Sequence, residues 1–209
     1  MRIFLDTADF EEIKAADKTG LIDGVTTNPT LIKKSGRDPI EVYQDIKELG
    51  ITDISMEVTG DLNQMIEDGN RLNEMFSEVI TIKVPMTVEG LQACKYFSED
   101  NIRTNVTLVF NAAQAVLAAK AGATYVSPFV GRIDDQGYAG TEVVRSCVDL
   151  LRRTNTQVLA ASIRSTQRVV RCFYSGADVV TIPPGVFWQM YKHVLTDVGL
   201  DIFEKDLIT

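Results

Sequence analysis

The stretch Val79-Ile80-Thr81-Ile82-Lys83-Val84-Pro85-Met86 shows one half of the unit that repeats along this chain. It is short, rich in β-branched residues and closed by a proline, which is typical of a buried strand. Similar apolar runs, each followed by a helical stretch, recur about every 25 residues. The repeating unit is therefore one strand followed by one helix.

Eight such strands are predicted. They are Arg2–Asp6, Gly24–Thr27, Asp53–Val58, Ile80–Val84, Ile102–Thr107, Thr124–Phe129, Gln157–Ser162 and Asp178–Ile182. Three of the intervening helices have a clear N-cap residue and a terminating glycine. These pairs are Asp38 with Gly50, Asn111 with Gly122, and Ser165 with Gly176.

Eight strand–helix units of one type favour a parallel sheet closed into a (β/α)8 TIM barrel, an α/β fold. The alternative is an open, doubly wound sheet, which is less favoured because no glycine-rich fingerprint follows the first strand. We expect residues 1–209 to form one barrel domain with a helical extension over about 183–209.

The composition excludes several classes of partner. Lys and Arg number 21 against 29 Asp and Glu, so the net charge is −8, which argues against general binding to nucleic acid or to an anionic membrane. No apolar run reaches transmembrane length, and the apolar start is too short for a signal sequence. The three cysteines, Cys94, Cys147 and Cys172, are far apart and are predicted to be reduced, which indicates a cytoplasmic location.

Lys83 is the only charged residue in its apolar run. Burial disfavours the charged form of an amine, and a neutral amine is a nucleophile toward carbonyl carbon. One alternative is that Lys83 caps the strand and extends to water. Another is that it forms a structural ion pair with Glu57 or Asp6.

Active sites of such barrels lie at the carboxyl ends of the strands. Here those ends carry Asp6, Thr26, Thr27, Asn28, Glu57, Lys83, Asn105, Thr107, Ser127, Ser162 and Thr181. Two carboxylates and an amine on separate strands suit acid–base chemistry around an imine.

A second cluster consists of Arg132, Ser162 and Arg164 on the loops after the sixth and seventh strands. Two guanidinium groups and a hydroxyl on adjacent loops can clamp a phosphate, although arginines on loops are often simply solvated. Asp134 and Asp135 are interpreted as part of a solvated loop. A zinc site lacks ligands, because His193 is the only histidine and is expected on the surface or at an interface of a terminal helix.

Several segments now form a recognisable pattern. They are Phe4–Thr7, Gly24–Thr30, Thr81–Pro85, Asn105–Phe110, Ser127–Asp134 and Ala160–Arg164. In this order they closely resemble the small transaldolases and the fructose-6-phosphate aldolases, over essentially the whole chain. The resemblance implies an enzyme that uses neither a cofactor nor a metal and that acts on small sugar phosphates.

The resemblance also implies roles for individual residues. Lys83 matches the lysine that forms the Schiff base. Asp6 matches the acid that takes the proton from the substrate C4 hydroxyl. Glu57 and Thr107 match the pair that holds a catalytic water. The predicted substrate-binding residues are Thr26, Asn28, Asn105, Ser127 and Phe129 around the dihydroxyacetone unit, and Arg132, Ser162 and Arg164 around the phosphate.

Three positions indicate the transaldolase branch. The aldolase branch typically has glutamine at Glu57, tyrosine at Phe129 and alanine at Ser127. An apolar ring at Phe129 cannot donate a proton, so it favours transfer over release. Two alternatives stay open, a fructose-6-phosphate aldolase and a non-catalytic sugar-phosphate-binding barrel.

A homo-oligomer is also expected. The C-terminal segment, with Phe187, Trp188, Met190, Tyr191, Leu195, Val198, Leu200, Ile202 and Phe203, offers more apolar surface than one barrel wall would cover. The resemblance implies a decamer of two pentameric rings, in which the terminal helix reaches onto a neighbour.

Overall fold

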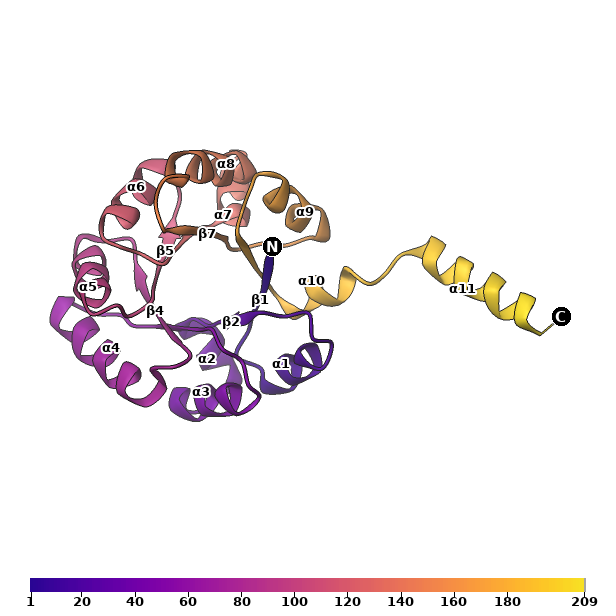
Figure 1. Ribbon diagram of the computed structural model, residues 1–209, viewed down its shortest axis with the longest axis horizontal. Coiled ribbons are helices and arrows are strands. Elements are labelled where there is room, and N and C mark those ends of the chain that lie inside the picture. Colours follow the sequence, from indigo (N-terminus) through magenta and orange to yellow (C-terminus); the bar gives the residue numbers. More distant parts are fainter. Residues whose placement is uncertain (209) are drawn as a thin grey trace.

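The computed structural model describes residues 1–208, and its eight parallel strands close into one barrel (Figure 1). The strands neighbour one another in chain order, and β1 pairs with β8 to complete the ring. They are β1 Arg2–Asp6, β2 Gly24–Thr26, β3 Ile54–Glu57, β4 Ile80–Pro85, β5 Thr104–Val109, β6 Tyr125–Pro128, β7 Gln157–Ala160 and β8 Val179–Ile182. The predicted (β/α)8 fold is confirmed, and the open sheet is wrong.

Helices surround the barrel in Figure 1, except for the last one, which projects away from it. They are α1 Phe10–Asp17, α2 Pro29–Ser35, α3 Pro39–Glu48, α4 Leu62–Phe76, α5 Val88–Glu99, α6 Ala112–Lys120, α7 Val130–Asp135, α8 Gly140–Leu151, α9 Thr166–Tyr174, α10 Pro184–Gln189 and α11 Val194–Leu207. The sequence did not predict α2 and α7. Both are short, and each follows a strand directly at the mouth of the barrel.

The predicted helix starts are confirmed. The side chain of Asp38 accepts hydrogen bonds from two backbone N–H groups of α3, and the side chains of Asn111 and Ser165 each accept one such bond at the start of α6 and α9. Cys94, Cys147 and Cys172 are buried, free thiols in α5, α8 and α9. Within residues 1–208, no helix combines the length and apolar character needed to cross a bilayer.

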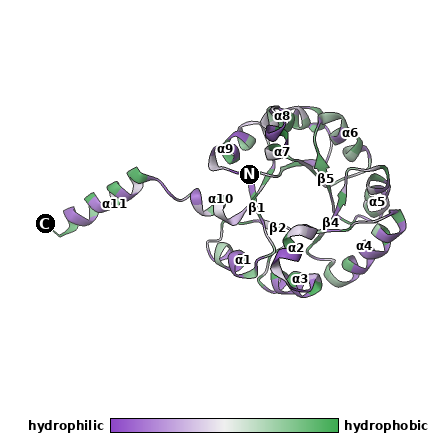
Figure 2. Cartoon of the chain, turned by 180° about the vertical axis from the view of Figure 1, so that it is seen from behind, coloured by the Kyte–Doolittle hydropathy of each residue, from purple (hydrophilic) through white to green (hydrophobic). Residues whose placement is uncertain are grey.

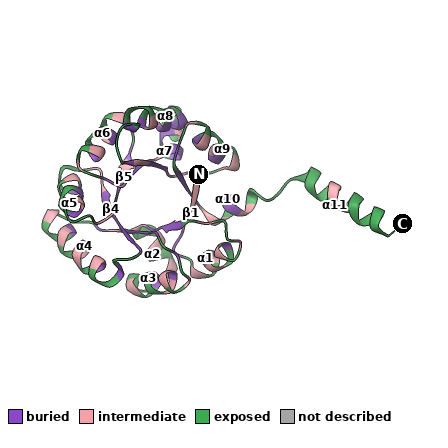
Figure 3. Cartoon of the chain, in the orientation of Figure 1, coloured by how far each residue is buried: buried purple, intermediate pink, exposed green. Residues whose placement is uncertain are grey.

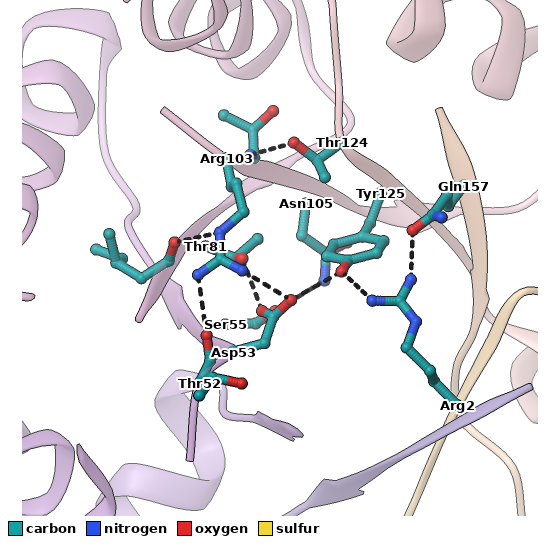
Figure 4. Close-up of polar contacts among 12 residues, drawn as sticks. Arg2, Thr52, Asp53, Ser55, Thr81, Arg103, Asn105, Thr124, Tyr125 and Gln157 are labelled. Carbon is teal, nitrogen blue, oxygen red and sulfur yellow. Dashed lines mark hydrogen bonds and ion pairs between the residues drawn. The ribbon is translucent and has the colours of Figure 1, made fainter. Parts of the chain in front are cut away.

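A buried polar network joins residues at the amino ends of the strands, opposite the mouth (Figure 4). Asp53, 5% exposed, accepts hydrogen bonds from Thr81 Oγ1 (2.8 Å) and Tyr125 Oη (2.7 Å), and Arg103 Nη1 lies 3.2 Å from its Oδ2. Arg2 donates to Tyr125 Oη at 2.8 Å and to the side chain of Gln157. Because strands far apart in sequence share these bonds, the network ties this end of the barrel together.

The C-terminal extension has two parts that behave differently. Helix α10 packs on the barrel, where Phe187 is 2% exposed and Trp188 Nε1 donates to Glu12 of α1 at 3.3 Å. Helix α11 projects away from the barrel, exposed along almost its whole length (Figures 1 and 3). The expectation that Phe187 belongs to uncovered apolar surface is therefore wrong, whereas Trp188 is only partly covered.

Hydrophobic and hydrophilic residues are interspersed along helix α11 (Figure 2). Its exposed apolar residues are Val194, Leu195, Val198, Leu200, Ile202, Phe203 and Leu207. His193 is exposed and precedes α11 as its N-cap, with Nδ1 accepting from Leu195 N at 3.2 Å.

Candidate active site

Lys83 lies on β4 with its side chain inside the barrel, 5% exposed. Its Nζ donates to the Thr27 carbonyl oxygen at 2.9 Å and lies 3.0 Å from Glu57 Oε2. Glu57 is directly opposite Lys83 in the register of β3 and β4. The interpretation of Lys83 as a strand cap that reaches water is wrong, and the ion pair with Glu57 is present.

Asp6 ends β1 and lines the same cavity as Lys83. Its Oδ1 accepts a hydrogen bond from Thr26 Oγ1 at 2.8 Å. Burial raises the pKa of this carboxyl group, while the nearby charge of Lys83 and the bond from Thr26 oppose the rise. A carboxyl group with a raised pKa is a better proton acceptor, which suits a general base.

Thr107 presents an unpartnered hydroxyl beside Lys83. It is 1% exposed, and its Oγ1 is the one buried side-chain polar atom in the described residues that has no hydrogen-bond partner. The register between β5 and β6 shifts after Val106, and Leu108 has a φ of 61°. Such an irregularity redirects neighbouring side chains, and a buried hydroxyl left without a partner is suited to bind water or substrate.

Two amides are held in defined orientations. Asn28 Oδ1 accepts from Leu31 N at 3.0 Å as the N-cap of α2, which leaves its Nδ2 free to donate. Asn105 is fully buried, accepts from Ser127 Oγ at 2.7 Å and donates to Ser55 Oγ at 3.2 Å. Sequence reasoning missed Ser55, although it lies two residues before Glu57 on one strand and so shares its face.

Arg132 lies on α7, not on a loop as expected, and its Cζ is 5.0 Å from the centre of the Phe129 ring. Within residues 1–208 it forms no salt bridge. Ser162 lines the same cavity as Arg132 and lies in the left-handed region at φ 58°, and its carbonyl accepts from Gly131 N at 2.9 Å. A non-glycine residue held there indicates a local constraint of the kind that clusters at functional sites.

The interpretation of Asp134 and Asp135 as a loop is wrong, although Asp135 is exposed as expected. They end α7, and both are paired with arginines. Arg164 Nη1 and Nη2 each lie 2.6 Å from an oxygen of Asp135, and Arg168 Nε lies 3.0 Å from Asp134 Oδ2. The hydrogen bond from Arg164 lowers the pKa of Asp135.

Most of the predicted site residues line one cavity of about 110 Å³ at the barrel mouth. They are Asp6, Thr26, Asn28, Lys83, Asn105, Thr107, Ser127, Phe129, Arg132 and Ser162. Glu57 lines an adjoining cavity that also includes Lys83 and Arg132, and Arg164 is turned toward Asp135 instead. Among the described residues, no group of His, Cys, Asp and Glu side chains is arranged to hold a metal ion.

Fold and cavity together define a (β/α)8 barrel with its polar residues at the carboxyl ends of the strands, where barrel enzymes hold their active sites. The family model described as "Transaldolase/Fructose-6-phosphate aldolase" matches residues 3–207. The chain therefore belongs to this family.

Relatives resemble the chain over nearly its full length. A "Probable transaldolase" of Clostridioides difficile (strain 630) and another of Caulobacter vibrioides (strain NA1000 / CB15N) are each 49% identical over 209 residues, covering 99% of this chain and 96% of the relative. A "Probable transaldolase" of Nitrosopumilus maritimus (strain SCM1) is 45% identical over 210 residues, covering 99% and 94%. These names support a transaldolase-type enzyme.

Proposed function

We propose that this protein is a transaldolase that transfers a dihydroxyacetone unit from sedoheptulose 7-phosphate to glyceraldehyde 3-phosphate through a Schiff base on Lys83. The observation that carries the proposal is the position of Lys83: its buried Nζ lies 3.0 Å from Glu57, in a cavity that Asp6 also lines. A pure sugar-phosphate-binding barrel has no need for a buried amine beside two carboxylates.

Imine formation uses Glu57 and Thr107. Glu57 takes a proton from the Lys83 ammonium group, and the neutral amine attacks the C2 carbonyl of the ketose. The carbinolamine oxygen takes one proton from the attacking nitrogen. It takes a second proton back from Glu57 through a water bound by Glu57 and the unpartnered Thr107 hydroxyl, and it leaves as water to give the protonated imine. The ion pair between Lys83 and Glu57 thus supports the chemistry, because the partner of the amine is also its base.

Carbon–carbon cleavage uses Asp6. Asp6 takes the proton of the C4 hydroxyl, the C3–C4 bond breaks, and its electrons pass into the imine to form an enamine while the aldehyde leaves. The enamine then attacks the acceptor aldehyde, and Asp6 returns its proton to the new C4 oxygen. The pKa of Asp6, raised by burial, supports both directions of this proton transfer.

Substrate binding follows from the remaining side chains. Asn28 Nδ2, Ser127 and Asn105 bind hydroxyls of the dihydroxyacetone unit, with Thr26 at its edge beside Asp6. Arg132, Ser162 and Arg164 bind the phosphate. Phe129 covers the enamine without a group that can protonate it, which favours transfer over the aldolase reaction.

Borohydride reduction tests the mechanism. Fructose 6-phosphate with borohydride should add a reduced ketose adduct to the mass of the wild type, and peptide mapping should place it on Lys83. Lys83→Met should form no adduct, and Lys83→Arg should not restore it because guanidinium stays protonated. An unchanged wild-type mass would disprove the Schiff base.

The exposed helix α11 also bears on the oligomeric state of the protein. We propose a homo-oligomer, with a decamer as the expected size, in which α11 packs on a neighbouring copy and covers its own apolar residues. Its projection from the barrel and its exposed Leu195, Ile202 and Phe203 support this. The mass of the full chain measured by sedimentation should exceed the monomer mass of 23.1 kDa. The double variant Ile202→Glu with Phe203→Glu should have a lower mass than the wild type. A wild-type monomer at micromolar concentration would refute the proposal.

A further inference from the structure

We propose that Thr181 on β8 is a positioning residue that orients the Asp6 carboxylate through Thr26. The inference rests on the proposed role of Asp6 in cleavage. None of the roles derived above involves Thr181, although it lines the same cavity as Asp6 and Lys83.

The three side chains form a short chain of hydrogen bonds across β1. Strand β1 lies between β8 and β2, with Phe4 opposite Thr181 on one side and Asp6 opposite Thr26 on the other. The two threonine Oγ1 atoms lie 2.6 Å apart, and Thr26 Oγ1 lies 2.8 Å from Asp6 Oδ1. Thr26 is 2% exposed and Thr181 3%.

Which group donates each of these hydrogen bonds follows from counting the hydrogen atoms that are available. An ionised carboxylate accepts hydrogen bonds but has none to donate, and a hydroxyl has a single hydrogen. Thr26 must therefore donate to Asp6. Its oxygen is left as the acceptor, so Thr181 must donate to Thr26. Both hydroxyl dipoles then point toward the carboxylate.

This arrangement fixes one oxygen of Asp6 and leaves the other for the substrate. Oδ1 is held by Thr26, whereas no hydrogen bond to Oδ2 is found among the described residues, and the Asp6 side chain lines the cavity. Hydrogen bonds in series polarise one another, so the bond from Thr181 strengthens the bond from Thr26 to Asp6. Without Thr181, the Thr26 hydroxyl has a buried oxygen with no donor and is free to rotate away.

The charged groups around Asp6 set the direction of the expected pH effect. Lys83 and Arg132 line the same cavity, and Glu57 pairs with Lys83 next to it. All three remain in place when Thr181 is changed. Loss of a donor chain that favours the carboxylate should therefore raise the pKa of Asp6 further above its ordinary value.

Three variants of the full-length protein separate positioning from structural support. Thr181→Val removes the hydroxyl at nearly constant shape, and Thr181→Ser restores it. Thr156→Val is the matched control. The Thr156 hydroxyl is buried and donates to the Ala123 carbonyl oxygen at 2.7 Å, but Thr156 does not line the cavity. Thermal unfolding of each variant shows the loss of stability that a buried hydroxyl causes in either place.

Thr181→Val should still be trapped by borohydride with fructose 6-phosphate as the wild type is, since imine formation does not use Asp6. In a separate reaction without borohydride, its single-turnover cleavage of the enzyme-bound ketose should fall about tenfold, and the acid limb of its pH–rate profile should move to higher pH. Thr181→Ser should recover the wild-type cleavage rate and pH–rate profile, and Thr156→Val should change neither of them.

A Thr181→Val enzyme with the wild-type pH profile would overturn the proposal, and so would a Thr181→Ser variant that fails to recover it. A Thr156→Val enzyme whose pH–rate profile shifts as much as that of Thr181→Val would also overturn the proposal. Failure of the proposed function is recognised separately, because the wild type itself would then form no adduct.

Discussion

Asp135 and Arg164 face each other as a fork-to-fork ion pair, with both guanidinium Nη atoms 2.6 Å from a carboxylate oxygen. The pair lies beside Ser162, where the phosphate of a substrate is proposed to bind. Arg164 therefore has an internal competitor for any phosphate, whereas Arg132 has no acidic partner in residues 1–208. The two arginines should differ in their effect on binding.

Arg132→Ala should weaken the binding of phosphorylated aldehydes by about 1.5–3 kcal/mol, seen as a higher KM, because a charge-assisted bond is lost. Arg164→Ala should raise KM less, since its guanidinium must first leave Asp135. Asp135→Asn should lower KM for phosphorylated aldehydes by releasing Arg164. Steady-state kinetics with glyceraldehyde 3-phosphate test this, and unphosphorylated glyceraldehyde is the control. Equal effects on both aldehydes would rule out a phosphate clamp.

Asp6→Asn should reduce turnover by about 10²–10⁴-fold while the covalent intermediate accumulates, because the base for cleavage is lost but imine formation is not. Borohydride trapping during turnover measures the accumulation. Near-normal turnover of this variant would contradict the assignment.

The same substitution should affect stability in a pH-dependent way. Burial raises the pKa of Asp6 above the ordinary aspartate value of 3.8. The folded protein thus holds this proton more tightly than the unfolded chain, so the contribution to stability is complete below pH 3.8 and is lost as pH rises through the raised pKa. Relative to Asp6→Asn, the wild type should lose stability over that range, which chemical denaturation at several pH values measures.

Tyr125 should link alkaline pH to unfolding. Burial and the neighbouring Asp53 carboxylate raise its pKa from 10.0 to about 12. The folded state keeps this proton longer than the unfolded chain, so the stability from Tyr125 is present below pH 10.0 and is lost toward pH 12. Tyr125→Phe should have a shallower decline in stability over this range, measured by denaturant unfolding. Parallel curves for the two proteins would show that Tyr125 does not contribute.

Phe129→Tyr and Glu57→Gln should move the activity from transfer toward release. A phenol beside the enamine can supply a proton, and glutamine removes the charge that pairs with Lys83. Both act at the same imine, so the double variant should differ from the sum of the single ones. Release of free dihydroxyacetone with and without an acceptor aldehyde measures the ratio. If the wild type cleaves fructose 6-phosphate without an acceptor as fast as it transfers, the aldolase is the correct function.

The sequence by itself determined the features that depend on neighbouring residues. Strand positions follow from short apolar runs, and helix starts follow from caps such as Asp38 and Ser165, because both signals are local. Lys83 was identified as unusual from its run alone. Once eight parallel strands are predicted, the polar residues at their carboxyl ends must meet at one mouth, so most of the candidate site followed too.

Tertiary structure alone decided which side chains pair. The contact between Thr26 and Thr181 joins residues 155 positions apart and exists only because β8 closes on β1. Likewise, Arg164 turns to Asp135 because α7 brings that carboxylate within reach, and Phe187 is buried whereas Phe203 is exposed because α10 packs on the barrel and α11 leaves it. Such pairings depend on strand register and barrel closure, which no local pattern encodes.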